Sequence, residues 1–159
     1  MNSRIRLATK KDMPKVLNLI KELAQFEMEP EAVEVTVQEL IKDGFKDNPE
    51  FVCFVAEINN KIEGMALAYL RYSTWKGIVL HLEDLIIKQE SRGSGLCTSL
   101  LDKVVKYGHE IGVKRISWEV LDWNKPAIDF YNKKGAYIKK GWRVVHLDEY
   151  GIKNYIAKI

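Results

Sequence analysis

Residues 81–101 read HLEDLIIKQESRGSGLCTSLL, and this stretch decides the fold because a strand and a helix meet in it. Residues 79–87, VLHLEDLII, are apolar enough for a central strand covered on both faces, and the leucines near the end of the quoted stretch follow helical spacing. Between them stands SRGSG, with one arginine and two glycines. The first amides of a helix lack helical partners and carry partial positive charge, so glycines there favour a bound anion. For this stretch alone, a plain glycine turn before a helix is the alternative.

The predicted strand carries two acids, Glu83 and Asp84, in its middle. Neighbouring side chains on a strand point to opposite faces, so we expect one of the two carboxyl groups to face inward. A carboxyl group held there is a candidate for proton transfer or for binding a cation. Pairing with a nearby lysine or arginine is the alternative for Glu83.

Hydrophobic periodicity assigns the elements on either side of this stretch. Before it, we expect a strand at residues 4–8, helices at 9–26 and 36–45, and strands at 51–58 and 62–72 joined by a turn at 59–61. After it, we expect a helix at 95–112, a strand at 114–121, a helix at 124–135, and a closing pair of strands at 142–147 and 153–159. The pairs Thr9–Asp12 and Thr36–Glu39 have the spacing of helix capping boxes.

This order of elements predicts an α/β (α+β) fold class with a single mixed sheet of about six to seven strands and about four helices. The strands and helices do not alternate regularly, which argues against a Rossmann fold. At 159 residues, with no linker or repeat, residues 1–159 are expected to form one domain.

Composition excludes several classes of protein. The chain is 47% hydrophobic and 30% charged with a net charge of +3, which suits a globular protein and a small anionic ligand better than nucleic acid. No apolar run of about 18 residues and no secretory segment at residues 1–10 are present, so a cytoplasmic protein without a membrane partner is expected. Cys53 and Cys97 form no CxxC pair, which argues against a disulfide framework or a zinc site.

Several catalytic motifs fail on inspection. GSGLCT is not GxGxxG, no GKS or GKT follows, no serine stands in GxSxG, and His109-Glu110 does not continue into HExxH. The remaining histidines, His81 and His146, add no metal-ligand spacing, so we expect no metal. Hydrolase and metalloenzyme functions therefore lack support.

Three phrases together resemble the GNAT family of acetyl-CoA-dependent N-acetyltransferases: HLEDLII, ESRGSGLCTSLL and VLDWNKPAIDFYNKKGA. The family pattern is a strand, then Arg-x-x-Gly-x-Gly/Ala at a helix entrance, then Asn before a helix that bears Phe-Tyr and ends at Gly-Ala. The residues that fit this pattern are Arg92, Gly95, Asn124, Tyr131 and Gly135, whereas Cys97 stands where the family has glycine or alanine. The resemblance spans residues 4–142 and implies the GNAT fold, with a largely antiparallel sheet whose central parallel strands splay apart.

Within that family, the chain is most similar to the diamine (spermidine/spermine) and thialysine N-epsilon-acetyltransferase group. The phrases that carry this similarity are LIKELAQFE at 19–27, STWKG at 73–77, HLEDLII at 81–87, LDWN at 121–124, FYNKKGA at 130–136 and GW at 141–142. It implies acetyl transfer from acetyl-CoA to the primary amine of a small mono- or diamine, by direct attack in a ternary complex.

The resemblance implies acetyl-CoA as co-substrate. Its pantetheine arm is expected along the end of the strand at residues 79–87, and its pyrophosphate on the amides of the glycine loop, where Arg92 adds charge. The expected cofactor-binding residues are Leu85, Ile86, Ile87, Arg92, Gly93, Ser94, Gly95, Leu96, Cys97, Thr98, Asn124, Pro126, Ala127, Tyr131 and Lys133.

The resemblance also implies two proton-transfer residues. A primary amine has a pKa near that of lysine, about 10.4, so it reaches the site as an ammonium and must lose a proton. Glu83 is the expected base, directly or through a water, and a backbone amide near Leu85 could stabilise the oxyanion. Tyr131 is the expected acid for the departing thiolate. Without the resemblance, a tyrosine on this helix would be interpreted as core packing.

The expected substrate-binding residues are Phe26, Glu27, Trp75, Glu83, Asp84 and Glu119, because aromatic rings and carboxylates hold cations. Ser73 and Lys140 replace acids of the polyamine-acetylating pattern, which favours a thialysine- or lysine-like amine over a long polyamine. Acetylation of a protein or peptide, and acyl-CoA sensing without turnover, remain alternatives. The resemblance further implies a homodimer.

Overall fold

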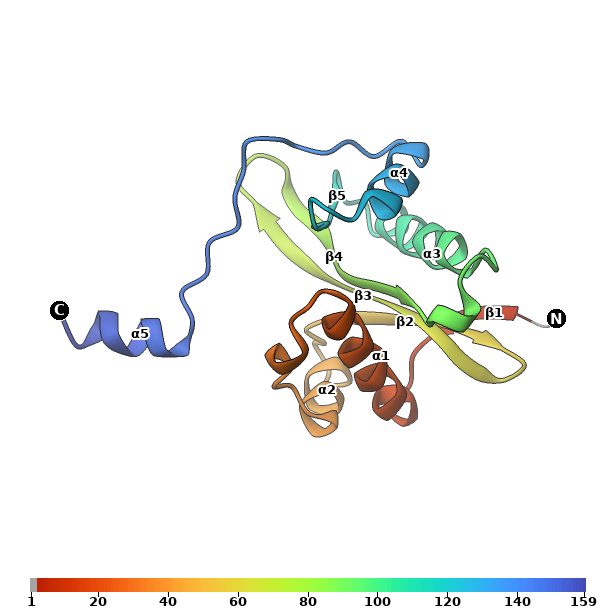
Figure 1. Ribbon diagram of the computed structural model, residues 1–159, viewed down its shortest axis with the longest axis horizontal. Coiled ribbons are helices and arrows are strands. Elements are labelled where there is room, and N and C mark those ends of the chain that lie inside the picture. Colours follow the sequence, from red (N-terminus) through yellow and green to blue (C-terminus); the bar gives the residue numbers. More distant parts are fainter. Residues whose placement is uncertain (1–2) are drawn as a thin grey trace. The chain divides into compact units, whose positions relative to one another are not determined.

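The computed structural model describes residues 3–159, which form two compact units (Figure 1). The first unit ends at Glu119, and the second comprises Val120–Ile159. The strand, glycine loop and helix at residues 81–101 lie in the first unit, and the Asn124–Gly135 segment lies in the second.

The first unit is built on one mixed sheet, which confirms the predicted fold class. Its strands are β1 (Ser3–Leu7), β2 (Val52–Ile58), β3 (Lys61–Ser73), β4 (Gly77–Ile87) and β5 (Ile116–Ser117), and they are paired in that order. The first three pairings are antiparallel and the pairing of β4 with β5 is parallel. Residues 3–159 thus hold five strands, fewer than the six to seven predicted.

Helices cover both faces of this sheet (Figure 1). The helices α1 (Met13–Phe26) and α2 (Val37–Gly44) lie on one face and α3 (Leu96–Glu110) lies on the other. Short 3-10 turns, η1 (Lys10–Asp12), η2 (Pro30–Ala32) and η3 (Gln89–Ser91), lead into or connect these elements. The second unit holds α4 (Lys125–Lys133) and α5 (Glu149–Ile156), so the described chain has five α-helices rather than the predicted four or so.

Local sequence signals account for where the first two helices begin. Both capping boxes are present: Thr9 with Asp12 before α1, and Thr36 with Glu39 before α2. The Glu39 carboxyl group accepts hydrogen bonds from the backbone amide and the hydroxyl of Thr36, both at 2.8 Å. Each box satisfies amides that the helix itself leaves unpaired.

Apolar side chains pack the face of the sheet under α1 and α2. The buried members of this core are Met13, Val16, Leu19, Leu40, Cys53, Val55, Met65, Leu67 and Ile86. Because this core includes Leu67 on β3 and Ile86 on β4, it packs against the end of β4 from one side. Burial of such side chains contributes about 1.5–3 kcal/mol each.

A charged network fixes β1 against η1 and β2. The Arg6 guanidinium donates to the carboxyl groups of Asp12, at 2.7 Å, and Glu57, at 2.5 Å, and Arg4 donates to Glu57 at 2.7 Å. The hydrogen bond from Arg6 lowers the pKa of Asp12 to about 2. This network therefore holds the start of α1, whose far end reaches the candidate site.

The structure corrects the prediction at three places. The strand expected at 114–121 is only the two residues of β5, residues 142–147 form no strand, and residues 153–159 lie largely in α5 rather than in a strand. A strand needs a partner, whereas a helix satisfies its own backbone groups. In this segment the local signals favour the helix, since Asp148 caps it by accepting from the Gly151 amide at 2.7 Å and Lys153 pairs with Glu149 at 2.5 Å.

No helix within residues 3–159 has both the length and the apolar character that crossing a membrane requires.

Candidate active site

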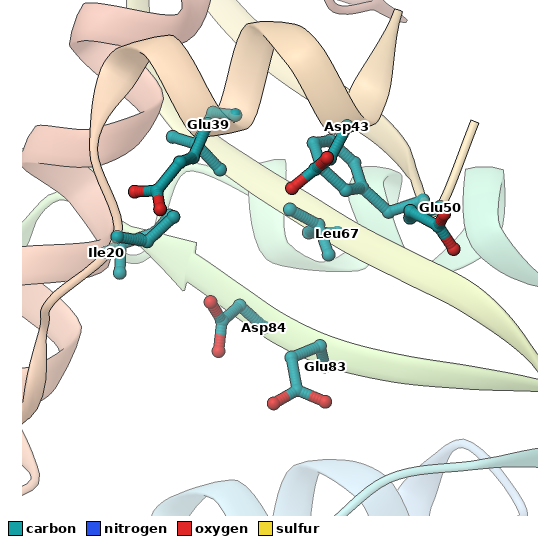
Figure 2. A pocket seen from close by; sticks show the side chains of 10 residues that line it. Ile20, Glu39, Asp43, Glu50, Leu67, Glu83 and Asp84 are labelled. Carbon is teal, nitrogen blue, oxygen red and sulfur yellow. The ribbon is translucent and has the colours of Figure 1, made fainter. Parts of the chain in front are cut away.

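The candidate site is centred on an irregularity in β4. Asp84 pairs with Leu67 of β3 and Leu82 pairs with Ala68, so Glu83 is an extra residue without a partner on β3. Such a bulge redirects a side chain and increases the local twist. Asp84 is half-buried and Glu83 is exposed, and the Glu83 carboxyl group points away from α2 in Figure 2. Of the two acids, Asp84 is therefore the one that faces inward.

A pocket of about 310 Å³ opens beside this bulge (Figure 2). It lies between α1, α2, the loops on either side of α2, and strands β3 and β4. Among the described residues, its lining is half apolar and half acidic, with no lysine, arginine or histidine: Ile20, Val35, Leu40, Phe51, Leu67, Glu39, Asp43, Glu50, Glu83 and Asp84. The apolar half can pack against hydrocarbon while the acidic half attracts a cation.

The electrostatics near Asp84 favour a positive ligand. Burial raises the pKa of Asp84 to about 6, and the negative charges of Glu83 and Glu27 add to the rise. Burial, followed by the charge of Glu83, also raises the pKa of Glu27. Crowded carboxylates in a partly dry site are stabilised when a cation enters. A bound ammonium ion would therefore reduce the repulsion among these carboxylates.

Two of the acids in the pocket also serve the fold. Glu39 closes the capping box of α2, and Glu50 forms an ion pair with Lys46. The attraction for a bound cation consequently depends most on the other three acids, Asp43, Glu83 and Asp84, of which the last two lie at the bulge.

Close to the bulge, strand β4 also stops pairing with β5. Parallel pairing with β5 is limited to Leu80 with Ile116 and His81 with Ser117. Beyond His81, β4 has no strand on that side among residues 3–159. The edge beside Leu85, Ile86 and Ile87 is thus left for an extended ligand to pair with, as the splayed strands of the predicted fold imply. The side chains of Ile86 and Ile87 are buried.

The glycine loop leads directly from this edge into α3. Gly93 and Gly95 have φ angles of 77° and 83°, and a Cβ atom at either would meet no described protein atom within 4 Å. The glycines are thus required by their left-handed backbone conformation, and the space outside them is open. Gly95 caps α3, whose first turn carries no acid. Ser94, Leu96, Cys97 and Thr98 complete the segment, and Leu96 is buried. The amides at the start of this helix suit an anion.

Arg92 connects the loop to the end of α1. Its Nε donates to the carbonyl of Ile87 at 3.3 Å, and its guanidinium carbon lies 5.5 Å from the centre of the Phe26 ring. Arg92, which is predicted to bind the anion, therefore contacts Phe26, which is predicted to bind the amine.

The remaining predicted substrate residues lie outside the acidic pocket. Trp75 is exposed in the turn between β3 and β4, where its backbone amide contacts Ser73 Oγ at 3.3 Å. Glu119 is exposed beyond β5, and neither Phe26 nor Glu27 lines the pocket. Only Glu83 and Asp84 of the predicted substrate set do so.

The second unit carries the other half of the sequence pattern on α4. Asn124 caps this helix by accepting from the Ala127 amide at 3.3 Å, and Pro126 occupies its first turn. Tyr131 is half-buried, with its ring centre 5.4 Å from that of Phe130. Lys133 is exposed in the last turn.

Sequence reasoning missed some residues of the site. Glu39 and Asp43 are four residues apart on α2, a spacing that places both on one helical face and could have indicated an acidic surface. Glu50 follows in the next loop.

His81 is considered above only as a metal ligand, and within residues 3–159 no group of three metal-ligating side chains forms. In the structure, its ring lies beside Glu83, with Nε2 3.6 Å from Oε2.

Comparisons with known proteins agree with this architecture. The model of the acetyltransferase (GNAT) family matches residues 16–136. The thialysine N-epsilon-acetyltransferase of Bos taurus is 34% identical over 165 positions, covering 97% of this chain and 97% of that protein. The Sus scrofa protein of the same name is 38% identical over 140 positions, covering 83% and 82%. These matches confirm the resemblance that the motifs indicate.

A solved structure of an integron cassette protein of V. cholerae superimposes with a TM-score of 0.78. The match covers 100% of this chain and 99% of that one at 19% identity, so it supports the fold alone.

Proposed function

The chain belongs to the GNAT family of acetyltransferases, and from this premise we propose that it acetylates the primary amine of a small cationic molecule with acetyl-CoA. The observation that carries the proposal is the acidic pocket at the β4 bulge, where the described lining brings Glu83 and Asp84 together with three further carboxyl groups and no basic side chain. An ammonium ion is the cation that an acetyltransferase of amines must hold before it reacts.

The size and lining of the pocket favour a small amine. A volume of about 310 Å³ is at the lower end for small-molecule sites. The apolar residues can pack against an alkyl chain, and a lysine-like amine or short diamine has such a chain between its polar ends. The names of the cattle and pig relatives, thialysine N-epsilon-acetyltransferases, support the same substrate class. We therefore place thialysine, lysine and short diamines ahead of long polyamines.

The residues along β4 and α3 fit acetyl-CoA, which supplies an acetyl group already activated as a thioester. The edge at Leu85, Ile86 and Ile87 would pair with the amides of its extended arm. The amides from Gly93 to Thr98 would hold the pyrophosphate, and Arg92 would add a charge-assisted contact. From α4, we propose contacts by Asn124, Pro126, Ala127, Tyr131 and Lys133.

Two side chains handle the protons in this proposal. Glu83 takes one proton from the substrate ammonium, directly or through a water, and so frees the nitrogen lone pair. As the nitrogen–carbon bond forms and the carbon–sulfur bond breaks, Tyr131 gives its phenolic proton to the departing sulfur. The nitrogen, now bonded to carbon, loses its second proton through solvent to the Tyr131 phenolate, which restores the phenol, and the proton on Glu83 leaves to solvent. The amide near Leu85 stabilises negative charge on the carbonyl oxygen. Glu27, Phe26, Trp75 and Glu119 are proposed to orient the amine around this centre.

We further propose that residues 1–159 act as one functional domain of a cytoplasmic protein, as length and composition predict, and that the protein is a homodimer, as the family resemblance implies. Sedimentation velocity checks the dimer. Acetylation of a protein or peptide is the second candidate activity, and the small volume of the acidic pocket favours the small amine over it.

The experiment is a substrate screen that follows free thiol. Lysine, thialysine, putrescine, spermidine and spermine are each offered with acetyl-CoA, and a lysine-containing peptide is the comparison. Thiol release with small amines and little with the peptide supports the proposal. Release with the peptide alone would favour the protein-acetylating alternative, and no release with any acceptor would favour an acyl-CoA sensor.

A further inference from the structure

His81 is a buried histidine that none of the roles above uses. It lies on β4 opposite Tyr69 of β3 and Ser117 of β5, so residues on both neighbouring strands flank its ring. Only 6% of the residue is exposed. Its Nδ1 lies 3.3 Å from Ser117 Oγ, and its ring centre lies 5.2 Å from that of Tyr69.

The other ring nitrogen faces the proposed base. His81 Nε2 is 3.6 Å from Glu83 Oε2, while the Glu83 side chain is 53% exposed. The imidazole thus connects the interior of the sheet to a carboxyl group at its surface. A distance of 3.6 Å is slightly longer than a hydrogen bond, so a small rotation of Glu83 brings the two groups into hydrogen-bond distance.

We propose that His81 is a positioning residue for Glu83 that also takes over the proton which Glu83 removes from the substrate ammonium. This inference rests on the proposed function. The proton moves from the Glu83 carboxyl oxygen to His81 Nε2, which restores the carboxylate and forms an imidazolium. Ser117 Oγ accepts from Nδ1–H of that imidazolium, and the restored Glu83 carboxylate pairs with its charge. The proton later returns through Glu83 to solvent.

The surroundings suit a group that is neutral before turnover. Burial lowers the pKa of His81, Arg71 on β3 lowers it further, and Glu83 and Glu119 oppose the change. Burial also raises the pKa of Tyr69, followed by the charge of Glu83, so its hydroxyl stays protonated near neutral pH. Near the end of α1, Glu27 interacts electrostatically with Glu83. A neutral imidazole held in this way is able to accept a proton.

The first test needs no turnover. The imidazole of His81 is titrated by nuclear magnetic resonance in the full chain, in wild type and in Glu83→Gln, with His81→Gln used to assign the signal. Removing the Glu83 charge should lower the His81 pKa, and the signals of His109 and His146 should not move. An unchanged His81 titration in Glu83→Gln would show that the two groups are not coupled and would overturn the inference.

The second test follows kcat/KM against pH with the best amine of the screen. His81→Gln should reduce kcat by about 100-fold and make the acidic limb shallower than in wild type, because one of the groups that titrate there, beside Asp84, is lost. Ser117→Ala keeps the imidazole and should lower kcat by a smaller factor, about tenfold. His109→Gln, an exposed histidine on α3, is the matched control and should behave as wild type.

The outcomes separate the two proposals. A wild-type enzyme that acetylates amines, with His81→Gln either fully active or uniformly slower with an unchanged pH profile, contradicts the role of His81 and leaves the proposed function standing. A wild-type enzyme that acetylates no amine overturns the proposed function itself.

Discussion

The guanidinium of Arg92 lies over the ring of Phe26, 5.5 Å from its centre, and joins the loop before α3 to the last turn of α1. The same guanidinium donates to the carbonyl of Ile87 at the end of β4. A residue proposed to bind pyrophosphate is therefore held by a residue proposed to orient the amine. Ligands at the two sites should influence each other through this contact.

Arg92→Gln should raise the KM for acetyl-CoA by at least tenfold, because a charge-assisted hydrogen bond contributes about 1.5–3 kcal/mol. Phe26→Leu removes the ring that holds Arg92 and should raise the same KM by about two- to fivefold. Steady-state kinetics with each substrate varied measures both effects. Arg143→Gln, an exposed arginine of the second unit, serves as the control. A KM for acetyl-CoA that is unchanged in Arg92→Gln contradicts the assigned anion contact.

Gly95 offers a way to separate backbone strain from a blocked ligand site. Its φ of 83° is left-handed, and the space around it is open. Asparagine tolerates this conformation better than alanine does, so Gly95→Asn should unfold near the wild-type temperature while Gly95→Ala loses about 1–2 kcal/mol. Because Gly95→Asn places a side chain where the pyrophosphate is proposed to lie, it should weaken acetyl-CoA binding by at least tenfold. Calorimetric affinity equal to wild type in a stable Gly95→Asn protein would remove the anion site from the loop.

The ionised Asp84 carboxylate should attract a cation but destabilise the folded protein. Its pKa in the folded protein, about 6, exceeds the ordinary value of 3.8, so ionisation at neutral pH destabilises the fold. Stability from this group is complete below 3.8 and is lost as the pH rises through 6. Asp84→Asn should therefore raise the free energy of unfolding at pH 7 by at most about 3 kcal/mol, since one pKa unit corresponds to about 1.36 kcal/mol. Urea denaturation checks this, with exposed Asp47→Asn as the control, and a destabilised Asp84→Asn contradicts it.

Binding of the amine should weaken in acid. As the pH falls through about 6, Asp84 gains a proton and loses its attraction for an ammonium ion. Titration calorimetry with the preferred amine should show an affinity about tenfold lower near pH 5 than near pH 7. In Asp84→Asn the affinity at neutral pH should be lower and this pH dependence should be reduced. Equal affinity at both pH values in wild type would mean that Asp84 does not contact the cation.

Much of the fold was predictable because its signals are local. Thr36 and Glu39 mark the start of α2 through hydrogen bonds between residues three apart. The hairpin between β2 and β3 turns at Asn59 and Asn60, whose φ angles of 50° and 64° suit asparagine. Signals of this kind depend only on neighbouring residues, so the sequence alone reveals them.

The errors arise where distant pairing decides the structure. The sequence at 114–121 alternates like a strand, but only Ile116 and Ser117 find partners on β4. Residues 153–159 are apolar enough for a strand, yet the Asp148 cap and the Lys153–Glu149 pair favour a helix. A strand is stable only beside another strand, and nothing in its own sequence shows how long that partner will be.

The candidate site was likewise predictable only in part, because some of its features depend on tertiary structure. Sequence motifs identified Glu83, Asp84 and the glycine loop as candidates. The bulge that gives the two acids different surroundings depends, however, on the register between β3 and β4. The acids of α2 reach the pocket only because the helix packs over the sheet, and in the sequence Glu39 is recognisable only as a cap. His81 and Glu83 stand two residues apart on β4, a spacing that places both side chains on one face of a strand, so their proximity could have been predicted from the sequence.

The decisive measurement is the detection of both products of a single turnover in wild type and in Tyr131→Phe. With acetyl-CoA and thialysine, mass spectrometry should find N-acetylated thialysine and free CoA in equal amounts. Tyr131→Phe should bind acetyl-CoA as wild type does while forming both products about 10²- to 10⁴-fold more slowly. CoA released without any acetylated amine would contradict amine acetylation as the activity, and full activity in Tyr131→Phe would contradict the role of Tyr131 as its acid.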